Sequence, residues 1–234
     1  MLTERLARIQ ATIATAQRRS GHTNPVEIIA VTKTHSAATI EDIYRAGLRT
    51  IGENRVQEAA RKFSLLPALP GLIRRMIGHL QTNKINKSLS LFDTIDSIDS
   101  VALFRAIESR LPEDRPPMDV LLEVNTSGEA AKHGFDSSAE EDMLSCLTSD
   151  RLSVKGLMTV GPLTDDATKI RAAFCSLYTL REKLNTHLPP EKKLTELSMG
   201  MSNDYEIAVE EGATMIRLGT LLFGPRKPWP PTHV

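Results

Sequence analysis

Residues 26–35 have the sequence VEIIAVTKTH, and this stretch decides the predicted fold. Apart from Glu27, its first half consists of apolar and β-branched residues, which is typical of a strand buried on both faces of a parallel sheet. The apolar run gives way at Lys33. Because ligands of α/β folds bind at the carboxyl ends of the parallel strands, Lys33 is a candidate binding residue. The ordinary alternative is a solvated lysine at a strand end.

Similar strands recur along the chain and alternate with amphipathic helices. Apolar residues at helical spacing, followed by glycine or proline, separate each strand from the next. The predicted strands are residues 26–33, 48–51, 73–77, 92–97, 120–125, 152–159, 196–198 and 215–218. This alternation predicts an α/β protein with a single (β/α)8 TIM-type barrel. A doubly wound open sheet is the alternative, but the glycine-rich turn of dinucleotide-binding folds is missing after the first strand.

An extra helix is predicted before the first strand, because Leu6, Ile9 and Ile13 recur at helical spacing. Little sequence follows the last strand, so this N-terminal helix is expected to fill the gap that remains in the outer ring. No charged linker or change of composition divides the chain. We therefore predict one domain over residues 1–234, with a core of about residues 5–224 and a tail at 225–234.

Composition and charge narrow the class of protein. The chain has 234 residues, of which 41% are hydrophobic, and 29 Lys and Arg balance 29 Asp and Glu. This balance predicts no overall attraction to nucleic acid, and no apolar run suggests a signal peptide or a membrane span. Cys146 and Cys175 are too few for a disulfide framework, which favours the reducing cytoplasm. A monomer is expected, because no bulky second domain that would enforce dimerisation is visible.

A closed barrel would bring the carboxyl ends of all its strands to one mouth. The selective residues expected there are Lys33, Glu53, Asn54, Arg55, His79, Gln81, Asn83, Asn125, Met158, Thr159, residues 198–202 (SMGMS) and residues 217–220 (RLGT). The last two groups place small residues and hydroxyls near helix starts, which suits a phosphate held by backbone N–H groups. A phosphate site and a lysine between apolar walls together indicate pyridoxal 5′-phosphate, whose aldehyde reacts with an amine.

Each of these residues also has a simpler interpretation. Glycines can serve only as turns, serines as helix caps, a histidine as a structural residue and an arginine as an ion-pair partner; this applies to Gly200, Gly219, Ser198, Ser202, His79 and Arg217. Met158, Met199 and Met201 suit packing. No spacing of Cys and His resembles a zinc site, so no metal site is predicted. The joint placement of the polar residues at one mouth is what favours a ligand site.

Six blocks of sequence carry a family resemblance. They are Ala30-Val-Thr-Lys-Thr34, Gly52-Glu-Asn-Arg-Val-Gln-Glu58, Ile77-Gly-His-Leu-Gln-Thr-Asn-Lys84, Gly156-Leu-Met158, Leu197-Ser-Met-Gly-Met-Ser-Asn-Asp204 and Ile216-Arg-Leu-Gly-Thr-Leu-Leu-Phe-Gly224. Together they resemble the pyridoxal phosphate homeostasis protein family, in order and over about residues 5–224. Arg55 stands where that family often has tyrosine, and Thr82 where it often has serine.

The resemblance implies an alanine-racemase-like barrel that holds pyridoxal 5′-phosphate as an internal aldimine on Lys33 and acts in vitamin B6 balance without an assigned reaction. No catalytic residue is predicted, and enzymes that require the cofactor are expected partners. The expected cofactor-binding residues are Lys33, Asn54, His79, Ser198, Met199, Gly200, Ser202, Arg217, Gly219 and Thr220. By resemblance to the racemases, Arg217 is assigned to the pyridine nitrogen, which it would keep unprotonated because a guanidinium only donates.

The alternative function is a weak amino-acid racemase. Racemisation by two bases needs a second proton-transfer group opposite Lys33. The resemblance to racemases would place a tyrosine near position 37, where this chain has Ala37. The chain's own tyrosines, Tyr44, Tyr178 and Tyr205, fall in predicted helices. These departures favour a binding protein over an enzyme.

Overall fold

The computed structural model describes residues 2–129 and 132–224, in which strands and helices alternate after one initial helix. The strands are β1 (Glu27–Val31), β2 (Thr50–Glu53), β3 (Ile73–Met76), β4 (Thr94–Ile98), β5 (Met118–Asn125), β6 (Phe135–Asp136), β7 (Leu152–Met158), β8 (Glu196–Ser198) and β9 (Met215–Leu218). The helices are α1 (Leu2–Ser20), α2 (Ala37–Arg45), α3 (Val56–Phe63), α4 (Ile85–Leu91), α5 (Val101–Glu108), α6 (Glu140–Cys146), α7 (Ala167–Thr186), α8 (Tyr205–Glu210) and α9 (Thr220–Phe223), with short 3-10 helices η1 (Thr82–Lys84) and η2 (Pro190–Lys192).

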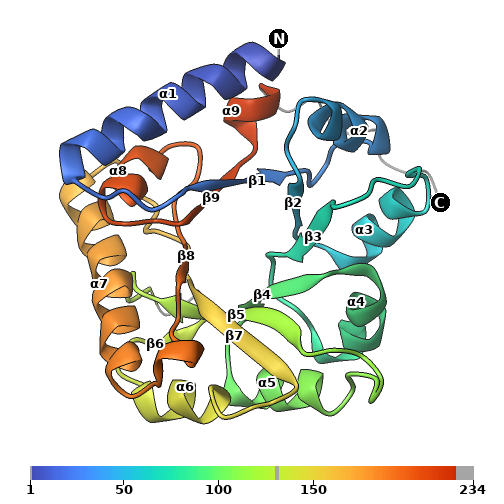
Figure 1. Ribbon diagram of the computed structural model, residues 1–234, viewed down its shortest axis with the longest axis vertical. Helices are drawn as coiled ribbons and strands as arrows, with labels where there is room; N and C mark the ends of the chain where they lie inside the picture. Colours follow the sequence, from blue (N-terminus) through green and yellow to red (C-terminus); the bar gives the residue numbers. More distant parts are fainter. Residues whose placement is uncertain (1, 130–131, 225–234) are drawn as a thin grey trace.

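The parallel strands close into a barrel, which Figure 1 shows from one end with the helices around it. Each strand pairs with the next in the order β4, β3, β2, β1, β9, β8, β7 and β5, and β4 also pairs with β5. That last pairing completes the ring, while the two-residue β6 pairs beside β5 outside it. The predicted (β/α)8 barrel is confirmed, and the alternative of an open doubly wound sheet is wrong.

Along each strand, side chains that face the barrel axis alternate with side chains that face the surrounding helices. On β1, Ile28 and Ala30 belong to the outer core between the sheet and the helices. Ile29 instead packs with Leu121 and Met158 from other strands of the ring. Both faces of the strand are therefore buried in apolar surroundings, which explains the nearly continuous apolar run in its sequence.

Helix α1 lies where the outer ring would otherwise be open. Its buried side includes Leu6, Ile9 and Ile13, and the helix packs against α8 and the four-residue α9 (Figure 1). The prediction that an N-terminal helix fills this gap is confirmed. The tail predicted at residues 225–234 lies outside the described residues.

Two local predictions are wrong. Ser138 and Glu141 have the sequence spacing of a capping box, which predicts a helix that starts after Ser138, but Ala139 is the N-cap of α6 and the Ser138 hydroxyl donates to Asp136. Strand β2 extends to Glu53 and does not end at Ile51. Glu53 is fully buried, and the charge of its side chain conceals this in the sequence. The extension brings Glu53 into the wall of the barrel.

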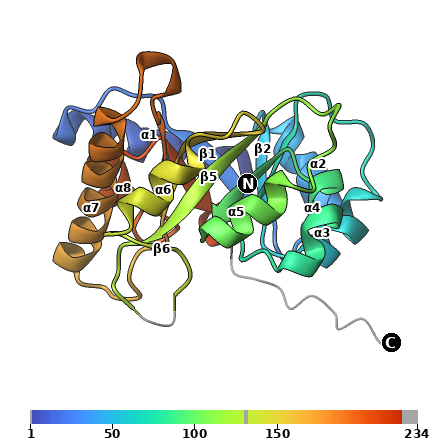
Figure 2. The same cartoon turned by 90° about the horizontal axis from the view of Figure 1, so that it is seen from below.

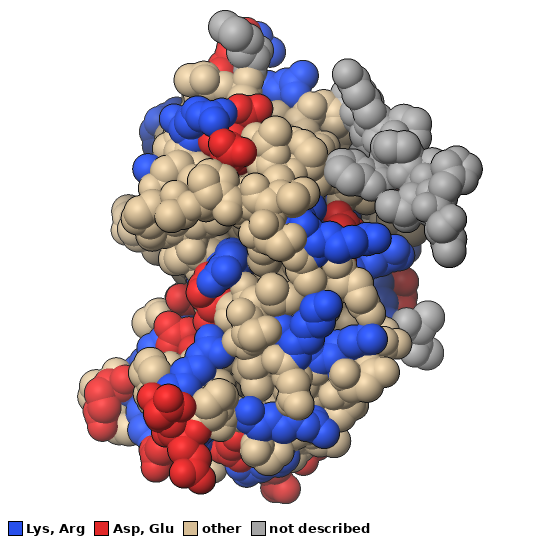
Figure 3. Space-filling view, turned by 90° about the vertical axis from the view of Figure 1, so that its right-hand side faces the viewer, with Lys and Arg blue, Asp and Glu red and all other residues tan. Residues whose placement is uncertain are grey.

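Among residues 2–129 and 132–224, no helix is long and apolar enough to cross a membrane. Figure 3 shows the side of α2, α3 and α4, where Lys and Arg are spread among uncharged atoms. Figure 2 views the barrel from its side, with α7 at one side of the strands and α3 and α4 at the other.

Candidate functional site

Lys33 stands at the barrel mouth, just beyond the end of β1, and is half-buried. Thr32 before it is fully buried, and its hydroxyl donates to Oε1 of Glu53 on β2. That contact turns Thr32 toward the outer layer, where Glu53 meets α3. Lys33 follows in a turn, which the N–H of His35 closes by donating to the carbonyl oxygen of Thr32 at 3.0 Å.

The turn after Lys33 has an unusual backbone. Thr34 has a φ of 66°, a left-handed conformation that costs a β-branched residue on the order of 1–2 kcal/mol. Its N–H donates to Oε1 of Glu58 on α3 at 2.5 Å. Strain of this kind persists only where surrounding contacts enforce it, and here the carboxylate of Glu58 does so.

A buried lysine on α3, Lys62, fixes the other side of this turn. Its ammonium donates to the carbonyl oxygen of Thr32 at 2.7 Å, and to Oε1 of Glu53 at 2.6 Å. It also donates to Oε1 of Glu58 at 3.1 Å. Burial raises the pKa of the Glu53 carboxyl, against the attraction of Lys62. Sequence reasoning missed Lys62, because a lysine on an amphipathic helix is ordinarily solvated.

The loops after β8 and β9 meet at the same mouth. The N–H of Leu221 in α9 lies 3.5 Å from Oγ of Ser202, so the two predicted phosphate loops are in contact. Thr220 is the first residue of α9 and is exposed. Gly200 has a φ of +91°, and a Cβ added there would lie 2.5 Å from Cβ of Ala208. Only glycine fits this turn.

Arg217 on β9 lies in the barrel interior and is only 4% exposed. Its guanidinium donates to the carbonyl oxygen and Oγ of Ser198, at 2.7 and 2.8 Å, and to the carbonyl oxygen of Thr159 at 2.6 Å. Burial lowers the pKa of Arg217, against the attraction of Glu123 and Asp204. The arginine therefore ties β9 to β8 and to the end of β7.

Glu123 on β5 places a buried acid in the same part of the barrel. Burial raises the pKa of its carboxyl to about 7, against the attraction of Arg217. The interior below the mouth thus combines a guanidinium with an acid that titrates near neutrality, an arrangement common at functional sites. Sequence reasoning missed Glu123, because it lies within an apolar strand and not at the strand end.

Asn54 and His79 follow β2 and β3 and line a hollow of about 370 Å³ between the ends of these strands. Oδ1 of Asn54 is buried and has no hydrogen-bond partner among the described residues. A buried acceptor of this kind is available to a ligand. Nδ1 of His79 lies 2.9 Å from Oδ2 of Asp99, which follows β4.

The structure joins some of the predicted site residues and separates others. The rim group, from the loops after β8 and β9, consists of Gly200, Ser202, Gly219 and Thr220. Ser198 is fully buried against Arg217, so its role as a direct phosphate ligand stays a prediction. The side chain of Met199 belongs to the outer hydrophobic core. Any contact from Met199 to a ligand at the mouth would therefore come from its backbone.

Comparison with known proteins first identifies the class of protein to which the barrel belongs. The chain matches the family model of the alanine racemase N-terminal domain over residues 5–227. Alanine racemase of Clostridium difficile 630, at 13% identity, shares the fold with a TM-score of 0.73 over 95% of this chain and 57% of that chain. The chain is therefore, by class, an alanine racemase N-terminal domain.

More similar relatives define the particular family. The pyridoxal phosphate homeostasis protein of Aquifex aeolicus is 38% identical over 226 residues, which cover 96% of this chain and 98% of the relative. PipY of Synechococcus elongatus, solved with PLP bound, is 38% identical with a TM-score of 0.83, over 96% of this chain and 100% of that chain. The chain belongs to the pyridoxal phosphate homeostasis protein family, and the predicted resemblance is confirmed.

Proposed function

We propose that this protein binds pyridoxal 5′-phosphate (PLP) covalently through the amine of Lys33 and holds it for release, as part of intracellular vitamin B6 homeostasis. The observation that carries the proposal is the clamped turn at residues 32–34, which Glu58 and Lys62 hold from both sides. Family membership and the PLP in the structure of PipY support it.

The residues at the mouth fit the parts of this cofactor. Lys33 provides an amine for the aldehyde. The rim group provides hydroxyls and close backbone approach for the phosphate. The unpartnered Oδ1 of Asn54 provides an acceptor for a hydroxyl on the ring. His79 borders the same hollow as Asn54 and is proposed as a further contact.

Two lysines lie beside this turn, and only Lys33 is suited to the reaction. An amine must be neutral to attack an aldehyde. The amine of Lys62 is buried, and its three hydrogen bonds to Glu53, Glu58 and the carbonyl oxygen of Thr32 occupy it fully. We therefore expect Lys62 to position Lys33 and not to compete with it.

Arg217 is proposed to contact the pyridine nitrogen. A guanidinium carries five N–H donors, and the bonds to Ser198 and Thr159 leave others for this contact. When bound, PLP supplies an aldehyde that condenses with amines and a ring that accepts electrons from a neighbouring carbon. Because a guanidinium only donates hydrogen bonds, the pyridine nitrogen beside it would accept and stay unprotonated, which keeps the ring a weak electron acceptor. That property suits storage better than turnover.

Reductive trapping tests the proposal. The purified protein is treated with borohydride, digested, and its peptides are mapped by mass spectrometry. The label is expected on Lys33, and Lys33→Ala is expected to lose both the label and the absorbance of the bound cofactor. A label on Lys84, Lys132 or Lys155 in the unaltered protein would overturn the assignment.

A second candidate function, amino-acid racemisation, needs a proton-transfer group opposite Lys33. The hydroxyl of Tyr44 on α2 donates to the carbonyl oxygen of Pro70. Tyr178 and Tyr205 lie in α7 and α8. All of these tyrosines are therefore on outer helices. Exchange of the α-protons of L-amino acids in deuterated water, at a rate well above that of free PLP, would favour the racemase.

We further propose that the protein acts as a monomer in the cytoplasm and passes PLP to enzymes that lack it. The thiols of Cys146 and Cys175 are both free, which suits a reducing compartment. Light scattering would measure the mass in solution. Activation of an apo-enzyme in the presence of a PLP trap would separate direct transfer from release into solvent.

A further inference from the structure

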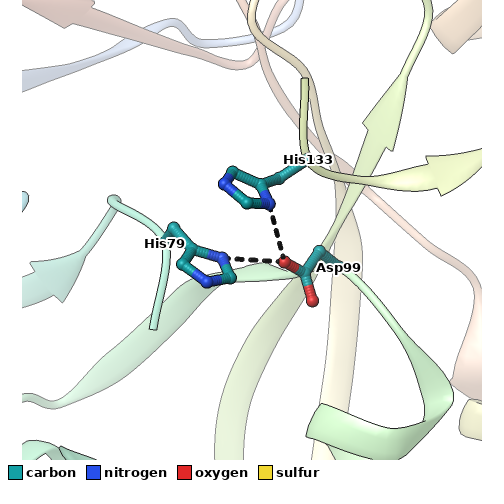
Figure 4. Close-up of side chains that lie close together, drawn as sticks. All are labelled: His79, Asp99 and His133. Carbon is teal, nitrogen blue, oxygen red and sulfur yellow. Dashed lines mark hydrogen bonds and ion pairs between the residues drawn. The ribbon is translucent and has the colours of Figure 1, made fainter. Parts of the chain in front are cut away.

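Two histidines and an aspartate from different loops meet at the barrel mouth (Figure 4). His79 follows β3, Asp99 follows β4, and His133 precedes β6. Oδ2 of Asp99 lies 2.9 Å from Nδ1 of His79 and 3.7 Å from Nδ1 of His133. Both imidazoles thus turn the same ring nitrogen toward one carboxylate oxygen.

The carboxylate is held in place by a further contact. The hydroxyl of Ser100 donates to Oδ1 of Asp99 at 3.1 Å, which leaves Oδ2 for the two histidines. Groups that orient a ligand in this way are a regular feature of metal sites. The side chain of Asp99 is 12% exposed, whereas His79 is 42% and His133 is 56% exposed. The cluster is therefore built on a fixed carboxylate and can be reached from solvent.

The two rings are also stacked, with centroids 3.8 Å apart and planes 10° from parallel. A hydrogen-bonded pair of His79 and Asp99 would be satisfied without a second imidazole. His133 instead comes from a separate segment and lies face to face with His79. The tertiary structure therefore brings a second imidazole to a carboxylate that already has one.

We propose that His79, Asp99 and His133 bind a first-row divalent cation of the zinc class. Two imidazole nitrogens and one carboxylate oxygen suit Zn²⁺ and its neighbours, whereas Mg²⁺ and Ca²⁺ prefer oxygen ligands. The three donor atoms lie within 4.8 Å of one another. The distances of 2.9 and 3.7 Å from Oδ2 bracket the ligand separation of about 3.4 Å that tetrahedral zinc requires.

The ion would join three separate parts of the rim. It would tie the segment before β6 to the ends of β3 and β4 through His133, and it would leave one coordination position for water or an oxygen ligand. The site shares the mouth with Lys33 but none of the residues that hold the Lys33 turn. His79 is also a proposed PLP contact, whereas Asp99 and His133 are not, so substitutions at Asp99 and His133 test the metal site separately from PLP binding.

Cobalt and zinc titrations test the site in the full-length protein after EDTA treatment and dialysis. Cys175→Ser serves as the background, because Cys175 is an exposed thiol that could itself bind zinc. We expect one Co²⁺ per chain, with the visible absorption of a low-coordinate nitrogen and oxygen site, that Zn²⁺ displaces and Mg²⁺ does not. His133→Gln and Asp99→Asn should each weaken binding more than about tenfold, since even indirect partners of a metal site contribute that much.

His187→Gln is the matched control, because His187 is exposed at the end of α7 and far from the cluster in the fold. It should leave the affinity for cobalt unchanged. Titrations with and without bound PLP separate this site from the cofactor, whose own oxygens can bind metals. The proposal would be overturned if His133→Gln bound cobalt as tightly as the background, or if His187→Gln lost as much affinity as His133→Gln. Binding that requires PLP would also overturn it.

Discussion

The ammonium of Lys62 lies 2.6 Å from Oε1 of Glu53, and both side chains are almost fully withdrawn from water. A buried ion pair is weak evidence for stability, because removing two charges from water costs several kcal/mol for each ion. The pair has a second consequence here, since the same ammonium donates to the carbonyl oxygen of Thr32, next to Lys33. The ion pair is better explained by its role in positioning Lys33 than by a contribution to the free energy of folding.

Lys62→Met is expected to destabilise the fold and to slow the reaction of Lys33 with PLP. The substitution leaves Glu53 buried without its cation, which costs about 3–5 kcal/mol. Urea unfolding measures the free energy of unfolding, and the rate at which a borohydride-reducible adduct forms measures the state of Lys33. Adding Glu53→Gln should recover part of the free energy of unfolding but not the rate of adduct formation, because the carbonyl oxygen of Thr32 still lacks the donor that Lys62 provides.

Lys87→Met is the matched control for this experiment, since Lys87 is exposed on α4. It should change the free energy of unfolding by less than about 0.5 kcal/mol. If Lys62→Met proves as stable as Lys87→Met and reacts as fast as the unaltered chain, the ion pair does not position Lys33.

The barrel interior predicts a pH dependence through Glu123. Its pKa is about 7 in the folded chain and near the ordinary value of 4.5 when unfolded. Between these two values the unfolded chain has lost the proton that the folded chain keeps, so the free energy of unfolding falls as pH rises from about 4.5 to about 7. The decrease from this one group is on the order of 3 kcal/mol, and above pH 7 its contribution stays constant.

Glu123→Gln removes this titration with little change of shape. Urea unfolding at pH 5, 6 and 7 should show a smaller decrease for the variant than for the unaltered chain. Burial also raises the pKa of Glu196 to about 7. Part of the decrease in the free energy of unfolding should therefore persist in Glu123→Gln and be smaller again in the double variant with Glu196→Gln. Identical slopes for the unaltered chain and Glu123→Gln would show that this carboxyl titrates normally.

The fold was predictable from sequence because both faces of each strand are buried. Residues such as Ile28 and Ile29 face different cores, yet both cores are apolar, so the strands stand out as short apolar runs. Strand ends were less certain where a buried charge extends a strand. Glu53 is such a residue, since its partner Lys62 lies on the following helix and only the fold brings them together.

Candidate site residues could be predicted from sequence only where they lie at or near strand ends. Lys33 and Arg217 follow from position, but the bonds from Arg217 to Ser198 depend on the register of β8 and β9. The cluster that includes Asp99 and His133 has no recognisable spacing, because its members come from separate loops. Interactions of this kind are set by tertiary geometry and leave no periodic pattern in the sequence.

Hydroxyls of the rim group and of the barrel interior should differ in their effect on PLP. Ser202→Ala and Thr220→Val should weaken PLP retention roughly ten- to hundredfold each, since charge-assisted bonds to phosphate contribute about 1.5–3 kcal/mol. Ser198→Ala should chiefly lower the free energy of unfolding, because its hydroxyl accepts from Arg217. Equilibrium dialysis of PLP and urea unfolding measure the two effects. A larger loss of PLP in Ser198→Ala than in the rim variants would make Ser198 the direct phosphate ligand.

The turn at Gly200 gives the last prediction, and Gly47 provides a matched control. Both glycines are left-handed, with φ of +91° and +94°. An alanine at Gly47 would meet nothing within 4 Å, whereas at Gly200 its Cβ would lie 2.5 Å from Cβ of Ala208. Gly47→Ala should therefore cost about 1–2 kcal/mol for conformation alone. Gly200→Ala should cost about 1–3 kcal/mol more because of the clash, and it should also release PLP by displacing Ser202.

Ala208→Gly separates the clash from the conformation. Alone it should cost about 1 kcal/mol, as glycine does within a helix. Combined with Gly200→Ala it removes the opposing methyl group, so the two substitutions should destabilise less together than the sum of their separate effects. Urea unfolding of the four chains in this cycle, with PLP retention measured on each, tests the prediction. Strict additivity, or equal losses in Gly200→Ala and Gly47→Ala, would mean that the loop after β8 can shift away from α8 and does not need glycine to hold Ser202 at the mouth.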